Sequence, residues 1–412
     1  MRRKLFALLL SLAPLAAAQL EIDPQIAAEI AKIKAIDNHA HPVSAAPGDT
    51  GYDALPVEHM EAYTEPMRMR AGSPLAAEAT RQLFAVPHPK DDSYPAWILD
   101  RLGIETMLAN RVAMGPGIAP PRFLWVPYED ALLFPLDNSR LGAVNSDRKA
   151  FFEDEDRLLK RYLKECGLNA PPATLGEYLT KVVDATLERH KRGGAVAVKF
   201  EVAYLRSLDF DEVPMDVAAA VYKQRHAGAD YKKLQDFLFR HVAAKAGELG
   251  MAVHLHVAWG PGGYFHIAGT NPLLLESVFN DPQLRKTNFV MLHGGWPFTS
   301  EVTPLLTKPN VYADFSEQTL LNEPRAVARV LREWLEFAPD KVLFGTDAYP
   351  YSDELGWEQA GWVAMETTRQ ALGLALTGML HDGEITRERA IELARLVLHD
   401  NAAKLYGLIS YK

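Results

Sequence analysis

Two histidines separated by one residue close a short apolar run in the N-terminal part of the chain. His39 and His41 follow Ala35 and Ile36 in a segment that predicts a buried strand. Side chains two positions apart on a strand point to the same face, so both imidazoles are expected to project together. Neutral imidazoles are common ligands of divalent transition metals. The pair therefore predicts half of a metal site, and a pair that is only hydrogen-bonded in the core is the alternative.

Four further polar residues stand near the ends of otherwise apolar runs: Lys199, His256, His293 and Asp347. A polar group at the end of a buried strand costs free energy unless it is paired or liganded. All four belong to residue types that ligate metals or transfer protons. We therefore expect them to meet the histidine pair at one site.

Apolar runs alternate with helical patterns along the chain, which predicts a parallel sheet. The runs that predict strands are residues 35–40, 103–108, 122–126, 195–200, 251–257, 288–293, 311–315 and 341–347. Such a number of strand–helix units predicts an α/β fold of the (β/α)8 TIM-barrel type. The alternative is a doubly wound open sheet, but its usual G-x-G-x-x-G fingerprint is absent from this chain. Active sites of such barrels lie at the C-terminal ends of the strands, where the polar residues fall.

Helices are expected between the strands and also in two longer excursions. The segments of about 42–100 and 130–190 exceed an ordinary loop and predict two largely helical insertions. Single helices are expected at residues 19–34, 215–249 and 386–406. We expect residues 19–412 to form one barrel domain that carries both insertions.

The N-terminus is typical of a secretory signal peptide. Arg2-Arg3-Lys4 precede the apolar stretch Leu5 to Leu15, and Ala16-Ala17-Ala18 resemble a cleavage site. We expect residues 1–18 to be removed and the protein to be exported, periplasmic or secreted. An uncleaved anchor is the alternative.

The composition narrows the class of partner. The formal net charge is −9 at pH 7, which disfavours binding to nucleic acid or to anionic lipid. We expect a small-molecule substrate, no nucleic-acid partner and no membrane contact after cleavage of the signal peptide. Assembly into a homo-oligomer is left open.

The order His-x-His, Lys, His, His, Asp along a strand–helix chain resembles the amidohydrolase superfamily. Short segments of the chain are similar to sequences of its amidohydrolase-related branch, amidohydrolase 2, and of the nodulin-like subgroup within that branch. These segments are residues 198–208, 271–274, 292–297, 344–348 and 400–407. The resemblance covers nearly all of the chain after the expected signal peptide.

The resemblance implies a divalent metal, commonly zinc, in a site of one or two ions. It implies that the ligands are His39, His41, His256 and Asp347. In two-metal members the residue at the position of His293 is a further ligand, and the lysine at the position of Lys199 is carboxylated. The resulting carbamate has two oxygens that can bridge the two ions, whereas an unmodified ammonium has no lone pair with which to bind a metal. In one-metal members His293 polarises or protonates the substrate. Glu201 shares a face with Lys199 and is an alternative ligand at that position.

Positions around the site predict substrate contacts. His254 faces the same way as His256, but His256 is nearer the C-terminal end of its strand and is therefore the expected ligand. His254 is expected in a lower layer of the barrel. Arg206 is expected either to bind a substrate carboxylate or to pair with an acidic residue on a helix. The substrate-binding candidates on loops are Arg206, Trp259, His266, Trp296 and Tyr349.

The expected activity is that of a metal-dependent hydrolase in which a metal-activated water attacks a small amide, lactone or ester. Asp347 would take the proton of the water and return it to the leaving group. His293 or the metal would polarise the scissile carbonyl. A non-oxidative metal-dependent decarboxylase or lyase on the same site is one alternative. A non-catalytic exported binding protein is another, although it leaves unexplained why every expected ligand position is filled.

Overall fold

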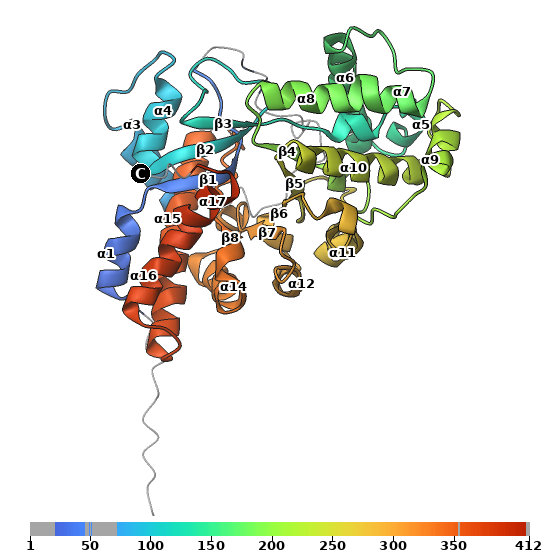
Figure 1. The fold of residues 1–412 in the computed structure, drawn as a ribbon. Coiled ribbons are helices and arrows are strands. Elements are labelled where there is room, and N and C mark those ends of the chain that lie inside the picture. Colours follow the sequence, from blue (N-terminus) through green and yellow to red (C-terminus); the bar gives the residue numbers. More distant parts are fainter. Residues whose placement is uncertain (1–20, 46–48, 50, 52–71, 353–354, 409–412) are drawn as a thin grey trace, which may run out of the picture.

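The computed structural model describes residues 21–45, 49, 51, 72–352 and 355–408, and Figure 1 shows their arrangement. The expected signal peptide and part of the first expected insertion lie outside these residues. Strands and helices alternate along the described chain, which confirms the α/β fold. Within the described ranges, no helix combines the length and the apolar character that crossing a lipid bilayer requires.

The strands form two parallel sheets, one with the order β1-β2-β3 and one with the order β4-β5-β6-β7-β8. The strands are β1 Ala35–Ala40, β2 Ile104–Asn110, β3 Phe123–Val126, β4 Ala197–Phe200, β5 Ala252–His256, β6 Phe289–Leu292, β7 Val311–Asp314 and β8 Val342–Leu343. Backbone hydrogen bonds link the two sheets on both sides. The Val196 N–H donates to the Trp125 carbonyl over 3.1 Å, and the Asn38 N–H donates to the Phe344 carbonyl over 2.8 Å. The strands therefore follow one another around a (β/α)8 barrel.

Helices surround the strands, as Figure 1 shows. They are α1 Pro24–Lys32, α3 Pro74–Phe84, α4 Tyr94–Leu102, α5 Ser139–Gly142, α6 Ser146–Glu165, α7 Leu175–Tyr178, α8 Ala185–Arg192, α9 Met215–Tyr222, α10 Tyr231–Glu248, α11 Glu276–Phe279, α12 Thr299–Leu305, α13 Gln318–Leu321, α14 Pro324–Phe337, α15 Trp357–His381, α16 Arg387–Arg395 and α17 Asn401–Leu405. The α14 helix illustrates why they pack. Its buried residues Val327, Leu331 and Trp334 recur every three or four positions and form one apolar stripe.

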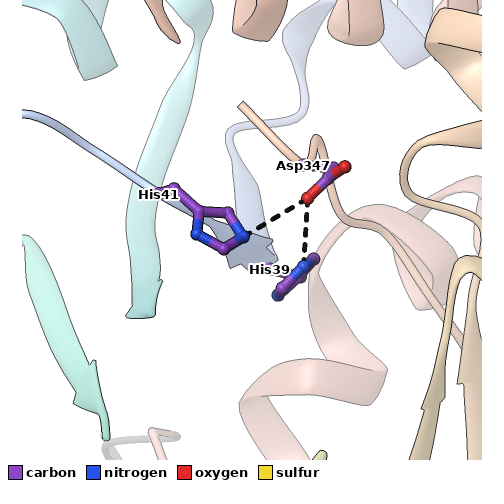
Figure 2. A group of neighbouring side chains, drawn as sticks. All are labelled: His39, His41 and Asp347. Carbon is purple, nitrogen blue, oxygen red and sulfur yellow. Dashed lines mark ion pairs between the residues drawn. The ribbon is translucent and has the colours of Figure 1, made fainter. Parts of the chain in front are cut away.

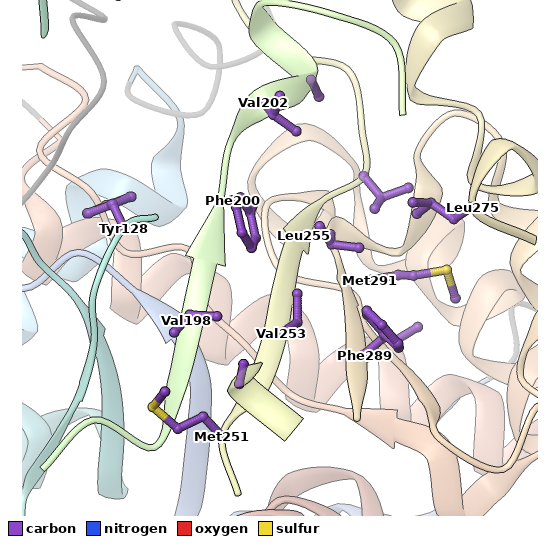
Figure 3. Close-up of a cluster of buried hydrophobic side chains, with 14 of the residues drawn as sticks. Tyr128, Val198, Phe200, Val202, Met251, Val253, Leu255, Leu275, Phe289 and Met291 are labelled. Carbon is purple, nitrogen blue, oxygen red and sulfur yellow. The ribbon is translucent and has the colours of Figure 1, made fainter. Parts of the chain in front are cut away.

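Alternate residues of the central strands enter two different apolar clusters. Val198, Phe200, Val253 and Leu255 pack outward in the large cluster that the helices complete, part of which Figure 3 shows. Their neighbours in sequence enter a second, smaller cluster, which includes Ala197, Ala252, Val290, Leu292 and, from α17, Ala402 and Ala403. The second cluster lines the inside of the strands. Because Lys199, His254 and His256 share the register of Ala197 and Ala252, their side chains also point inward.

Several elements differ from the expected boundaries. The strand expected at 341–347 ends at Leu343, so Asp347 lies four residues beyond β8 in an irregular segment. The helix expected at 215–249 is divided into α9 and α10, and only Pro24–Lys32 of the segment 19–34 is helical. The pairing of β1 with β2 shifts register between Asp37 and Ala40. Regular alternation along β1 therefore does not by itself decide which way His39 points.

Candidate metal centre

His39, His41 and Asp347 come together where β1 ends and where the chain leaves β8, as Figure 2 shows. One ligand atom from each residue lies within 4.8 Å of the other two, and all three residues are buried. Asp347 Oδ1 is 3.0 Å from His39 Nε2 and 3.5 Å from His41 Nε2. Two imidazole nitrogens and a carboxylate oxygen converging on one point are a donor set that suits a divalent metal.

Backbone contacts between the first and last strand regions place these three side chains. The Asp347 N–H donates to the His39 carbonyl over 2.8 Å, and the His41 N–H donates to the Ala348 carbonyl over 2.8 Å. Asp37 strengthens this connection, because its carboxylate accepts from the Thr346 hydroxyl over 2.6 Å and from the Thr346 N–H over 3.0 Å. The C-terminal half of β1 and the segment after β8 are therefore held side by side, although more than 300 residues separate them in sequence.

Neighbouring side chains orient the ligand groups. Asn110 Nδ2 lies 2.7 Å from His39 Nδ1, and the Tyr128 hydroxyl lies 3.0 Å from His41 Nδ1. The Tyr351 hydroxyl donates to Asp347 Oδ2 over 2.6 Å. Contacts of this kind hold a metal-ligating ring or carboxylate in its productive orientation. The sequence had not suggested Asn110, Tyr128 or Tyr351, because nothing in their local patterns distinguishes them from core residues.

The histidine nitrogens that face the site test whether a metal fits there. His39 Nε2 and His256 Nε2 are buried and make no hydrogen bond, even though His39 Nε2 lies close to Asp347. A buried nitrogen without a partner costs about 1–3 kcal/mol in a protein interior. Because a bound cation would satisfy both nitrogens, the residues present fit the divalent metal that the resemblance implies.

His256 and His293 lie next to the three converging residues. The ring centroid of His256 is 4.7 Å from that of His293, and the centroid of His293 is 5.0 Å from that of His39. His256 is, however, absent from both groups of potential ligands that lie within 4.8 Å of one another among the described residues. The expected set of His39, His41, His256 and Asp347 is thus assembled only in part, with His256 adjoining it through His293.

His293 is held by a short hydrogen-bonded chain. The Ser316 hydroxyl donates to Asp314 Oδ1 over 2.6 Å and lies 2.9 Å from His293 Nδ1. Since the hydroxyl hydrogen is directed to Asp314, Ser316 accepts from His293 Nδ1–H, which leaves the lone pair on His293 Nε2. The backbone of His293 has φ +63°, and the following Gly294 has φ +55°. A Cβ on Gly294 would lie 2.1 Å from the ring of Trp334, so glycine is required in this turn.

Glu317 is a site residue that the sequence analysis missed. It forms a second group with His293 and Asp347, in which one ligand atom of each lies within 4.8 Å of the others. Glu317 is 4% exposed, and its Oε2 is 3.8 Å from His293 Nδ1. It stands three residues after β7, a strand whose apolar sequence drew attention only to its core packing. The sequence did contain a signal for Glu317, because an acidic residue shortly after a barrel strand lies at the C-terminal end of the barrel, as do the other polar residues of the site.

Lys199 lies inside the barrel but outside both groups of potential ligands among the described residues. Its Nζ is 3.3 Å from Glu201 Oε1, and both side chains are buried. Lys199 is paired in the parallel register with His254 on β5. Its ammonium is thus placed beneath the histidines and next to Glu201, the residue that the sequence offered as an alternative ligand.

Burial and the Lys199 charge favour the neutral forms of His39, His256 and His293. Burial first, and then Lys199, lowers the pKa of His256 to about 3 and holds the pKa of His39 well below its ordinary value. Burial also holds the pKa of His293 well below its ordinary value. A neutral imidazole is the form that can ligate a metal.

The pKa values of the two carboxyl groups of the site, Asp347 and Glu317, are shifted in opposite directions. Burial opposes ionisation of Asp347, but the rings of His293, His39 and His41 together hold its pKa well below its usual range. Burial and the neighbouring Asp347 charge raise the pKa of Glu317 well above its usual range. The ionised form is therefore favoured at Asp347 and the protonated form at Glu317.

The expected substrate-binding residues occupy three environments. Arg206 Nη1 pairs with Asp236 Oδ1 on α10 over 2.7 Å, the helix-acid pairing that was one of its two expected roles. Arg206 and His266 also line a cavity of about 430 Å³. Tyr349 is closer to the site, with its ring centroid 5.4 Å from that of His41. Trp259 and Trp296 pack edge to face, with centroids 6.1 Å apart.

Comparison with known proteins identifies the family. The amidohydrolase family model, Amidohydro_2, matches residues 36–408. The chain belongs to the amidohydrolase family. A curated relative of this amidohydrolase is Protein fluG from Emericella nidulans, 30% identical over 184 residues. That alignment covers 43% of the present chain and only 20% of the length of the relative.

Solved structures support the fold of this amidohydrolase. A protein from Lactobacillus casei ATCC 334, described as a metal-dependent hydrolase, has a TM-score of 0.66 at 17% identity, with 94% of this chain and 98% of that chain covered. Uronate isomerase from Thermotoga maritima has a TM-score of 0.61 at 16% identity, with 93% and 98% covered. Glucuronate isomerase from Caulobacter crescentus has a TM-score of 0.59 at 12% identity, with 94% of each covered. At these identities the likeness shows the shared fold alone.

Proposed function

We propose that this amidohydrolase is a metal-dependent hydrolase that acts on a small amide, lactone or ester. The observation that carries the proposal is the convergence of His39, His41 and Asp347 within 4.8 Å of one another at the C-terminal ends of their strands. A divalent ion held there, which we propose to be zinc, would lower the pKa of a water molecule from ~15.7 towards ~7. The family membership and the barrel fold are consistent with such a site.

The side chains have separate tasks in this proposal. A pKa held well below its usual range favours the ionised form of Asp347, which suits it to accept the proton of the attacking water and later to deliver it to the leaving group. The Ser316 contact holds the His293 ring and leaves the lone pair on Nε2, so Nε2 can bind a cation or accept a proton, and the metal would polarise the scissile carbonyl. Tyr349 packs on His41 and is placed to line the substrate pocket.

The experiment that tests the proposal combines metal removal with a substrate panel. Purified protein would be assayed against small amides, lactones and esters before and after dialysis against a chelator, and again after addition of Zn²⁺. We expect hydrolysis that disappears on chelation and returns with Zn²⁺. Aromatic and unsaturated acids and uronates belong in the same panel, because decarboxylation and isomerisation are the competing reactions. Turnover of those compounds without any hydrolysis would refute the proposal.

Export of the protein is a separate proposal, supported by the sequence of residues 1–18. Mass measurement of the protein recovered from cells should show a chain that begins at Gln19. A chain that retains Met1 in a membrane fraction would instead indicate an uncleaved anchor. Membership of the nodulin-like subgroup likewise remains a prediction from the short sequence segments.

A further inference from the structure

Glu317 has no assigned purpose in the proposed hydrolysis, and its environment is unusual for a carboxyl group. It is buried, and its Oε2 makes no hydrogen bond. Its neighbours are His293, whose Nδ1 lies 3.8 Å away, and Asp347, which joins the same group within 4.8 Å. Two carboxyl groups that face each other in a dry site repel unless a proton or a cation lies between them. A bound cation could therefore take the place of a proton between these two carboxyl groups.

The donor atoms available in this group suit a divalent cation. The Ser316 hydroxyl oxygen accepts a hydrogen bond from His293 Nδ1–H, so the lone pair of His293 Nε2 is available to a cation. Asp347 belongs to this group and also to the group of His39 and His41. One carboxylate shared by two sets of ligands can hold two neighbouring cations.

The residue expected to bridge two ions does not stand in this position. Lys199 Nζ is 3.3 Å from Glu201 Oε1 and belongs to neither group of potential ligands among the described residues. A carbamate at Lys199 would put a negative charge beside the buried Glu201 carboxylate. An ammonium at Lys199 instead forms an ion pair with it.

We propose that His293, Glu317 and Asp347 form a second divalent-cation site next to the site of His39 and His41, and that Glu317 supplies the carboxylate expected from a carboxylated Lys199. The inference rests on the metal centre of the proposed function. The resemblance allowed for a second ion bound by His293, and the inference adds Glu317 as its ligand in place of Lys199, which no sequence motif had indicated. Lys199 remains an unmodified ammonium in this arrangement.

Metal stoichiometry tests the inference directly. Metal-free protein would be dialysed against a series of buffered free Zn²⁺ concentrations, and bound zinc would be counted by elemental analysis. The wild-type protein is expected to bind two ions per chain. Glu317→Gln should bind one ion tightly and the second at least about tenfold more weakly, since even removing a partner of a ligand costs that much. Glu201→Gln is the matched control, a buried acid outside the group, and should still bind two.

Three results would overturn the inference. They are a single ion in the wild-type protein, two ions of unchanged affinity in Glu317→Gln, and loss of the second ion in Lys199→Met with retention in Glu317→Gln. Should Glu317→Gln fail to fold, Glu317→Asp keeps the charge but withdraws the carboxylate, and it should weaken only the second ion. Two bound ions without hydrolysis of the panel would refute the proposed function and leave this site standing. One bound ion together with chelator-sensitive hydrolysis would refute the second site and support the proposed function.

Discussion

Two groups of polar side chains lie inside the barrel, and they differ in what their atoms face. The rim group consists of His39, His41, His256, His293, Glu317 and Asp347 at the C-terminal ends of the strands. The inner layer consists of Asn38, His254, Asp314 and Tyr406. In the rim group, His39 Nε2, His256 Nε2 and Glu317 Oε2 make no hydrogen bond. In the inner layer, each side chain bonds to another member.

The inner layer forms one hydrogen-bonded chain that ends at the rim group. His254 Nε2 lies 2.8 Å from the Tyr406 hydroxyl, which donates to Asn38 Oδ1. Asn38 Nδ2 donates to Asp314 Oδ2 over 2.8 Å, and Asp314 reaches His293 through Ser316. Both groups are buried, so burial alone does not identify the site. The lack of a partner alone does not identify it either, since His254 Nδ1 in the inner layer also makes no hydrogen bond. The convergence of ligand atoms does, because both groups of potential ligands among the described residues belong to the rim group.

The largest effect is expected at Asp347. Asp347→Asn keeps the shape of the side chain but removes the base, so kcat should fall by about 10²–10⁴-fold while most of the metal is retained. Steady-state kinetics and elemental analysis of the same preparation would check this. Full activity in the variant would show that Asp347 is not the base. It would also show that turnover depends no more on the rim group than on the inner layer.

A smaller effect is expected at the junction of the two groups. Ser316→Ala removes the hydroxyl between His293 Nδ1 and Asp314 Oδ1, so the ring loses the contact that orients it. We expect kcat to fall by about 10–100-fold, as for other partners of metal-site histidines. Ser316→Thr retains a hydroxyl and should recover part of the activity. If the alanine and threonine variants were equally impaired, steric disturbance would explain the loss better than orientation.

A substitution in the inner layer should lower the stability of the protein and leave its turnover nearly unchanged. Tyr406→Phe leaves His254 Nε2 and Asn38 Oδ1 without their shared partner, at a cost of about 1–3 kcal/mol. The urea midpoint of unfolding should therefore decrease, while kcat stays close to that of the wild type. A loss of turnover as large as that of Ser316→Ala would show that the two groups act as one unit.

The last effect is the dependence of stability on pH. Burial, followed by the Lys199 charge, lowers the pKa of His254 from 6.5 to about 3. The unfolded chain therefore takes up a proton below pH 6.5 that the folded chain refuses, and stability falls as the pH is lowered from 6.5 towards 3. Replacing His254 by Asn should reduce the slope of unfolding free energy against pH by about 1.4 kcal/mol per pH unit. Denaturant titrations of the metal-free proteins across this range would measure it, and identical slopes would contradict the buried, neutral state of His254.

Much of the fold was accessible from the sequence because its signals are local. The apolar runs at β4 to β7 and the helix Pro324–Phe337 have the strand and helix periodicities that burial imposes. The end of β8 was predicted wrongly, because Phe344 is apolar and Thr346 is β-branched, while their hydrogen bonds are made with β1, to the Asn38 N–H and the Asp37 carboxylate. Such pairing is not encoded in the local pattern.

The sequence by itself determined which residues of the candidate site have ligand chemistry. The motif His39-x-His41, with His293 and Asp347, marks strand ends, and polar groups survive there only when something satisfies them. Tertiary structure alone decided which of these meet. It brings Asp347 to His39, leaves Lys199 with Glu201, and places Glu317 opposite His293. The physical reason is that distances between side chains on different strands depend on the register and curvature of the whole barrel, which no single segment specifies.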